Sequence, residues 1–137
     1  MKTKILIFII LLSISLANID IPYTTRYSNI IKIENNDIYI FFKKPKNDDY
    51  ENINVVFLTD DLKKIKIKNV KVIFNRIINI NETEKMKYET TLIERNKNEY
   101  NGKFRLLYYG FWKFKLIIEK NKKIYTFKDY FFYSPTL

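Results

Sequence analysis

Apolar and polar side chains alternate in short runs from residue 29 to the end of the chain. Successive side chains of a β-strand point to opposite faces of the sheet, so this period of two indicates half-buried strands. The clearest run is residues 62–68, where leucine and isoleucine trade places with lysine. In a second run Trp112, Phe114 and Leu116 occupy alternate positions, and we expect all three to face the core.

Runs of this kind follow one another about every ten residues, which is typical of a β-sandwich. We predict strands around residues 31–33, 38–42, 54–58, 62–68, 70–74, 88–92, 104–108, 112–118 and 124–133. Turn or loop composition separates them at 43–49, 59–61, 79–86, 96–102 and 121–122. The runs at 62–68 and 70–74 form one bent strand or two separate ones. The prediction is an all-β, immunoglobulin-like sandwich of about seven to eight antiparallel strands.

One segment, residues 82–95, has some helical character because it is rich in glutamate and lysine. Tyr88, Thr90 and Thr91 are poor helix formers and fit a strand better. We therefore predict no helix after the amino-terminal segment.

The first 17 residues have the composition of a secretory signal peptide. Lys2 and Lys4 precede an unbroken apolar stretch, and the small residues Ser15 and Ala17 end it. A membrane helix needs about 20 mostly apolar residues, and this stretch is short for that purpose. We predict cleavage after Ala17, with an uncleaved anchor as the alternative, so that the protein is exported and is periplasmic, cell-surface or secreted.

The remaining chain has the length of a single domain. We expect residues 18–28 to be an irregular lead-in, interrupted by Pro22, and residues 29–137 to form the sandwich. The chain has no cysteine, so its apolar core must hold an exported domain without disulfides.

The chain is strongly basic, with 25 Lys and Arg against 15 Asp and Glu, a net charge of +10. A basic surface can bind wall polymers or nucleic acid. The same composition follows from an AT-rich genome, because Lys, Asn, Ile, Tyr and Phe are abundant and Ala, Gly and Pro are scarce. We favour compositional bias, because the charges are spread along the whole chain.

Two short segments carry a family resemblance, Asn101-Gly102-Lys103-Phe104 and Gly110-Phe111-Trp112-Lys113-Phe114. The pattern resembles the signature of YtkA-like and FixH-like domains, which are small exported immunoglobulin-like sandwiches of bacterial envelopes. The resemblance implies that Gly102 opens the penultimate strand and that Gly110 forms a hairpin leading into Trp112. Phe104 stands where the family has a tyrosine, so it lacks the hydroxyl that a tyrosine corner uses.

Reactive side chains are scarce. The chain has neither histidine nor cysteine, which removes Ser-His-Asp and Cys-His catalysis and the usual zinc and copper ligands. The acidic pairs Asp48/Asp49 and Asp60/Asp61 lie in predicted turns, where aspartate commonly stabilises the bend. We therefore expect no enzymatic activity, no cofactor, no metal site and no small-molecule substrate.

The aromatic stretch Tyr130, Phe131, Phe132 and Tyr133 is the candidate partner surface. The alternative is a closing strand with one face in the core. The expected function is that of a non-enzymatic binding or accessory module of the bacterial cell envelope, which meets a partner protein through a sheet edge or this aromatic stretch. The second expectation is a secreted cationic protein that adheres to anionic polymers. Membrane contact is expected only if the leader is uncleaved.

Overall fold

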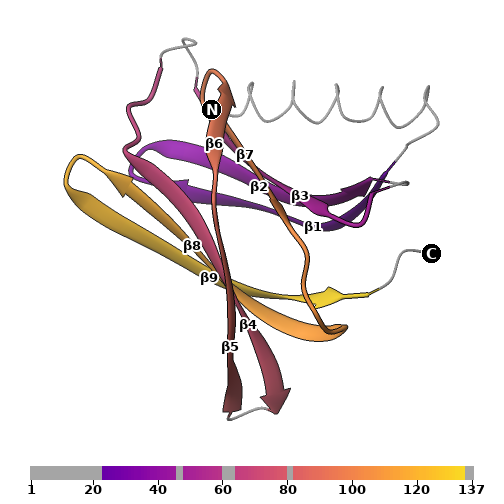
Figure 1. Ribbon diagram of the computed structural model, residues 1–137. Coiled ribbons are helices and arrows are strands. Elements are labelled where there is room, and N and C mark those ends of the chain that lie inside the picture. Colours follow the sequence, from indigo (N-terminus) through magenta and orange to yellow (C-terminus); the bar gives the residue numbers. More distant parts are fainter. Residues whose placement is uncertain (1–22, 46–47, 60–63, 80–81, 135–137) are drawn as a thin grey trace.

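The computed structural model describes residues 23–45, 48–59, 64–79 and 82–134 (Figure 1). The predicted signal peptide (1–17) and its cleavage point at Ala17 lie outside these residues. Within them the chain forms strands and connections, and no helix that could cross a membrane is present in this part of the chain.

The described strands form two antiparallel sheets that face each other (Figure 1). Sheet A has the order β1-β2-β3-β7-β6 and contains β1 (Tyr23–Ile33), β2 (Asn36–Pro45), β3 (Glu51–Leu58), β7 (Glu99–Phe104) and β6 (Ile93–Asn96). Sheet B has the order β5-β4-β8-β9 and contains β5 (Glu82–Thr91), β4 (Asn69–Asn79), β8 (Gly110–Lys120) and β9 (Lys123–Tyr133). The all-β prediction is confirmed, and the architecture is a β-sandwich. The described residues form nine strands, where about seven to eight were predicted.

The core lies between the sheets and is built from the alternate residues that the sequence pattern selected. Trp112, Phe114 and Leu116 are each at most 1% exposed, as predicted. Phe42 of sheet A packs against Phe114 of sheet B with ring centroids 5.0 Å apart in an edge-to-face contact. Contacts of this geometry add about 0.5 to 1.5 kcal/mol each beyond the burial of apolar area. Aromatic packing therefore joins the two layers in a domain without disulfides.

The clearest alternation in the sequence lies at residues 62–68, and none of the residues described there belongs to a strand of either sheet. Its described part, 64–68, connects β3 of sheet A to β4 of sheet B without joining a ladder. Ile65 is nevertheless 9% exposed, and its amide donates to Asn98 Oδ1 at 2.8 Å. The alternation arises because Ile65 and Ile67 pack on the core while Lys66 between them is exposed. The strand prediction was wrong for residues 64–68.

Several predicted boundaries also change. Residues 23–28, expected to be an irregular lead-in, belong to β1, which pairs with β2 along its length. Residues 82–86, expected to be a loop, belong to β5. The predicted turn at 96–102 shortens to Lys97 and Asn98, because β7 begins at Glu99. Thr25 and Tyr27 are good strand formers, and strand pairing outweighs the polar composition of this segment.

The two glycines have roles that differ from those implied by the family resemblance. Gly102 lies inside β7, and a Cβ there would come within 2.4 Å of Leu92 Cδ2. Leu92 is the buried residue at which the chain passes from β5 of sheet B to β6 of sheet A. Gly110 has φ +129°, but it begins β8 after a connection from sheet A to sheet B, so it does not form a hairpin. Gly102 therefore provides space at the crossover, and Gly110 provides conformational freedom.

Candidate functional site

The predicted surface at residues 130–133 is divided by the alternation of β9. Tyr130 and Phe132 are 57% and 51% exposed, whereas Phe131 and Tyr133 are 6% and 5% exposed. Phe131 packs edge-to-face on Phe42, with ring centroids 5.2 Å apart. Phe131 and Tyr133 therefore belong to the core, and the exposed candidate surface is reduced to Tyr130 and Phe132.

The neighbouring strand β8 adds an exposed aromatic residue to this pair. Phe111 lies directly opposite Phe132 in the β8–β9 ladder and is 61% exposed. The two rings form an edge-to-face contact with centroids 5.0 Å apart. We call Phe111, Tyr130 and Phe132 the aromatic face; it lies at one end of the outer side of sheet B.

The connection that precedes β8 extends the exposed apolar surface. Leu107, Tyr108 and Tyr109 are 78%, 45% and 61% exposed. The ring of Tyr109 stacks on that of Tyr133, with centroids 5.7 Å apart, and Tyr108 accepts a hydrogen bond from Trp112 Nε1 at its carbonyl oxygen. The connection is thus held against the core while its apolar side chains stay exposed. Clusters of exposed apolar residues of this kind mark interaction sites.

Three lysines continue the outer surface beyond the aromatic face. Lys113 lies opposite Tyr130, and Lys115 lies opposite Lys128. We call Lys113, Lys115 and Lys128 the lysine triad. Among the described residues none of the three forms an ion pair, whereas Lys71 on β4 of the same sheet pairs with Glu89 at 3.2 Å. Within the described residues, no direct ion pair therefore neutralises the charges of the triad.

A second feature is an open cleft of about 780 Å³ at one end of the sandwich. Its lining includes Lys44, Tyr50, Arg105, Tyr109 and Ser134. The cleft borders the connection that precedes β8, because Tyr109 belongs to both.

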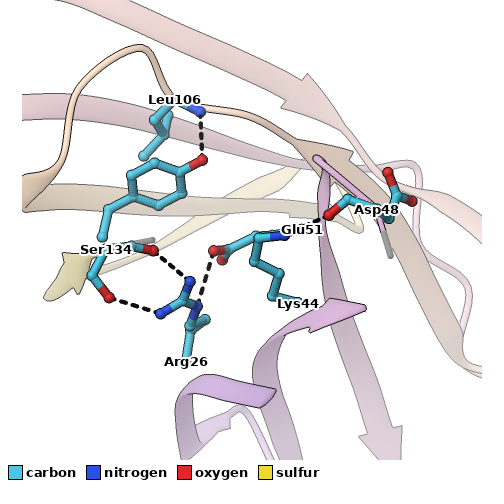
Figure 2. Close-up of polar contacts among 7 residues, drawn as sticks. Arg26, Lys44, Asp48, Glu51, Leu106 and Ser134 are labelled. Carbon is cyan, nitrogen blue, oxygen red and sulfur yellow. Dashed lines mark hydrogen bonds and ion pairs between the residues drawn. The ribbon is translucent and has the colours of Figure 1, made fainter. Parts of the chain in front are cut away.

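A buried polar cluster lies beside the cleft (Figure 2). Arg26 Nε of β1 lies 3.1 Å from Glu51 Oε1 of β3, and its Nη1 donates to Ser134 Oγ at 2.8 Å. Arg26 Nη2 donates to the Ser134 carbonyl oxygen, so one guanidinium joins both sheets. The Tyr133 hydroxyl accepts the Leu106 amide at 3.3 Å.

Burial governs the protonation of Glu51. Its side chain is 0% exposed, and its Oε2 has no hydrogen-bond partner among the described residues. Burial raises the pKa of the Glu51 carboxyl, and the nearby charges of Arg26 and Lys44 oppose that rise. A fully buried carboxylate cannot touch a substrate in this conformation, so the geometry assigns the cluster a structural role.

The paired carboxylates predicted from sequence have the turn role expected of them where the structure describes them. Asp48 Oδ1 accepts the Tyr50 amide at 3.0 Å, which holds the bend before β3. Asp49 is a surface residue, and its Oδ2 lies 4.0 Å from Arg105 Nη1. Asp60 and Asp61 lie outside the described residues. Within the described residues, no group of three or more Asp and Glu side chains is placed to hold a metal ion.

No protein-family model, curated protein or solved structure matches the chain. The functional proposal therefore depends on the surface itself. Sequence reasoning missed Phe111 and the lysine triad, although the signal was present: if Trp112 and Phe114 face inward, then Phe111, Lys113 and Lys115 face outward together.

Proposed function

We propose that this protein is an exported, non-enzymatic binding module that recognises another protein through the aromatic face. The observation that carries the proposal is the exposure of Phe111, Tyr130 and Phe132 together on one surface. Protein interfaces are enriched in aromatic side chains at their centre, and a few such residues commonly supply most of the binding energy. A stable fold has no need for three large rings in water, so binding explains them best.

We also propose that the sandwich is of the immunoglobulin-like type. Immunoglobulin domains place strands A-B-E-D in one sheet and C-F-G in the other. The order β2-β3-β7-β6 corresponds to A-B-E-D, and β4-β8-β9 corresponds to C-F-G, with β5 beside β4. β1 is then an additional strand at the edge of sheet A. This correspondence supports the proposed class. The proposed kinship with YtkA-like and FixH-like domains is supported by the sequence pattern alone.

Export is the second half of the proposal, and the amino-acid pattern of residues 1–17 supports it. Mass spectrometry of the protein recovered from its native source tests it directly. A mature chain that begins at Asn18 supports export with cleavage, whereas an intact Met1 in a soluble fraction contradicts it.

The experiment for binding is a capture assay with the immobilised protein and an extract of the cell envelope. We expect Phe111→Ala/Phe132→Ala to abolish capture of the specific partner. Ile124→Ala is the matched control, because Ile124 is a 69% exposed apolar residue of the same strand β9 at its other end. Equal capture by the wild type and the double variant would contradict the proposal.

Adhesion to anionic polymers is the alternative function, and the net charge of +10 favours it. Salt separates the two functions. Polyanion binding weakens steeply between low and moderate salt because it releases counterions, whereas an interface with an aromatic centre persists. We expect capture to survive moderate salt.

A further inference from the structure

The charge of the outer surface defines the kind of partner, if the proposed protein-binding function holds. The β8–β9 hairpin presents three successive cross-strand pairs on its outer side: Phe111 with Phe132, Lys113 with Tyr130, and Lys115 with Lys128. Over these three pairs the surface changes from apolar to cationic. The pairs are two residues apart along each strand, about 7 Å, so the three span about 14 Å, the length of about five extended residues.

The lysine triad differs in its ion pairing from the lysines on the neighbouring strands of sheet B. On β4 and β5 of the same sheet, Glu89 lies 3.2 Å from Lys71 and 3.7 Å from Lys87. No carboxylate within the described residues reaches the lysine triad at salt-bridge distance. A partner that covers the aromatic face brings its own groups close to these three charges, so electrostatic complementarity requires that those groups be acidic.

We propose that the outer side of the β8–β9 hairpin binds a short acidic segment of the partner protein, whose apolar side chains pack on the aromatic face and whose carboxylates face the lysine triad. The aromatic rings supply the desolvated centre of the interface, and the lysines form its rim. The rim charges select an acidic partner and accelerate association.

A nucleic-acid strand is the main rival occupant, because stacked bases and phosphates also match aromatic rings and lysines. The planes of the Phe111 and Phe132 rings are 71° apart, so the edge of one ring covers a face of the other. A run of stacked bases needs successive free ring faces. The edge-to-face pair suits the irregular packing of apolar side chains better than base stacking, which favours the protein segment.

The test uses fluorescence anisotropy with the whole protein and defined probes. The main probe is a labelled synthetic peptide with an apolar half and a glutamate half, made in both orders. Its controls are the same peptide with glutamine in place of glutamate, and a labelled oligothymidine strand. We expect the acidic peptide to bind at least tenfold more tightly than the glutamine peptide at low salt.

Two charge-matched variants identify the site. Lys113→Gln/Lys115→Gln/Lys128→Gln should weaken binding of the acidic peptide about tenfold. Lys66→Gln/Lys97→Gln/Lys122→Gln removes the same charge from exposed lysines elsewhere and should leave the affinity within about twofold. Lys113 and Lys115 are half-buried and the other four lysines are exposed, and thermal unfolding verifies that both variants remain folded.

The outcomes separate this inference from the proposed function. Equal loss in both lysine variants, or no binding of the acidic peptide, overturns the inference. The inference is also overturned if oligothymidine binds more tightly than the acidic peptide and if Phe111→Ala/Phe132→Ala leaves the affinity for oligothymidine unchanged. That result favours the polyanion alternative. If the captured envelope partner depends on Phe111 and Phe132 but not on the triad, the proposed function stands and only the acidic specificity fails.

Discussion

Arg26 Nε lies 3.1 Å from Glu51 Oε1, with side-chain exposures of 9% and 0%. Removing one partner of a buried ion pair leaves the other charge without compensation, whereas removing both can be nearly neutral. Glu51 comes from the interior of sheet A and Arg26 from its edge strand. The pair therefore couples β1 to the rest of the domain, and its energetics are open to direct measurement.

We predict that Arg26→Met destabilises the protein by about 3 to 5 kcal/mol, because it leaves the Glu51 carboxylate buried and unpaired. The double variant Arg26→Met/Glu51→Leu should be less destabilised than Arg26→Met alone. Urea unfolding of the wild type, both single variants and the double variant gives the comparison. Additive losses in the double variant would show that the two side chains are not coupled.

Glu51 also predicts how stability depends on pH. Burial raises its pKa above the usual 4.5, so the folded state holds the proton more tightly than the unfolded state. The stability linked to this group is complete below about pH 4.5 and falls as pH rises through the raised pKa. Glu51→Gln cannot titrate, so its unfolding free energy should lack this decline. Parallel profiles for the wild type and Glu51→Gln from pH 4 to 8 would contradict the prediction.

A third prediction concerns the polar contacts between the edges of the two sheets. The Tyr27 hydroxyl donates to Asp129 Oδ2 at 2.5 Å. Tyr27→Phe should cost about 1.5 to 3 kcal/mol, the usual value for a hydrogen bond to a charged group. Tyr130→Phe is the control, because the Tyr130 side chain is exposed, and it should change stability by less than about 0.5 kcal/mol.

The same tyrosine predicts loss of stability in alkali. Burial and the hydrogen bond to Asp129 raise the pKa of Tyr27 above 10.0, so the folded state opposes its ionisation. The stability linked to Tyr27 is complete below pH 10 and falls as pH rises further. Chemical unfolding at pH 9 and 11 measures the decline. It should be smaller in Tyr27→Phe, and an equal decline in both proteins would exclude this tyrosine as its source.

The two glycines predict different responses to the same substitution. Gly102→Ala places a methyl group against Leu92 Cδ2, and overpacking of this kind costs about 1 to 3 kcal/mol. Leu92→Val should recover part of that loss in the double variant. Gly110→Ala meets no atom within 4 Å but forces φ +129° on a residue with a Cβ, so its cost should be unaffected by Leu92→Val. Thermal unfolding of all five variants tests the distinction.

The sequence was sufficient for the class of fold because alternation reports burial directly. Trp112 and Phe114 occupy alternate positions of one strand, and both face the core as that pattern predicts. Alternation does not reveal hydrogen bonding, however, and residues 64–68 alternate while crossing from one sheet to the other. A connection that runs over the core buries every second side chain as a strand does, so periodicity alone cannot distinguish them.

Fewer residues of the candidate site could be predicted from the sequence. The aromatic content of residues 130–133 predicts a single exposed surface, yet strand geometry places Phe131 and Tyr133 on the opposite side from Tyr130 and Phe132. Phe111 joins the exposed pair only through the register of β8 against β9. The pairing of Arg26 with Glu51 joins residues 25 positions apart on strands that are not neighbours in the sheet, and no local pattern marks such a contact.

The guanidinium of Arg26 bonds to Ser134, so the chain enters β1 and leaves β9 at the same end of the sandwich. A stretching force applied at these two points would first break the Arg26–Ser134 contact. It would then separate β1 from β2 one backbone hydrogen bond at a time, because the load acts across the ladder rather than along it. The domain should consequently extend at low tension, and a tether that joins it to a surface through both ends would yield gradually rather than rupture in a single event.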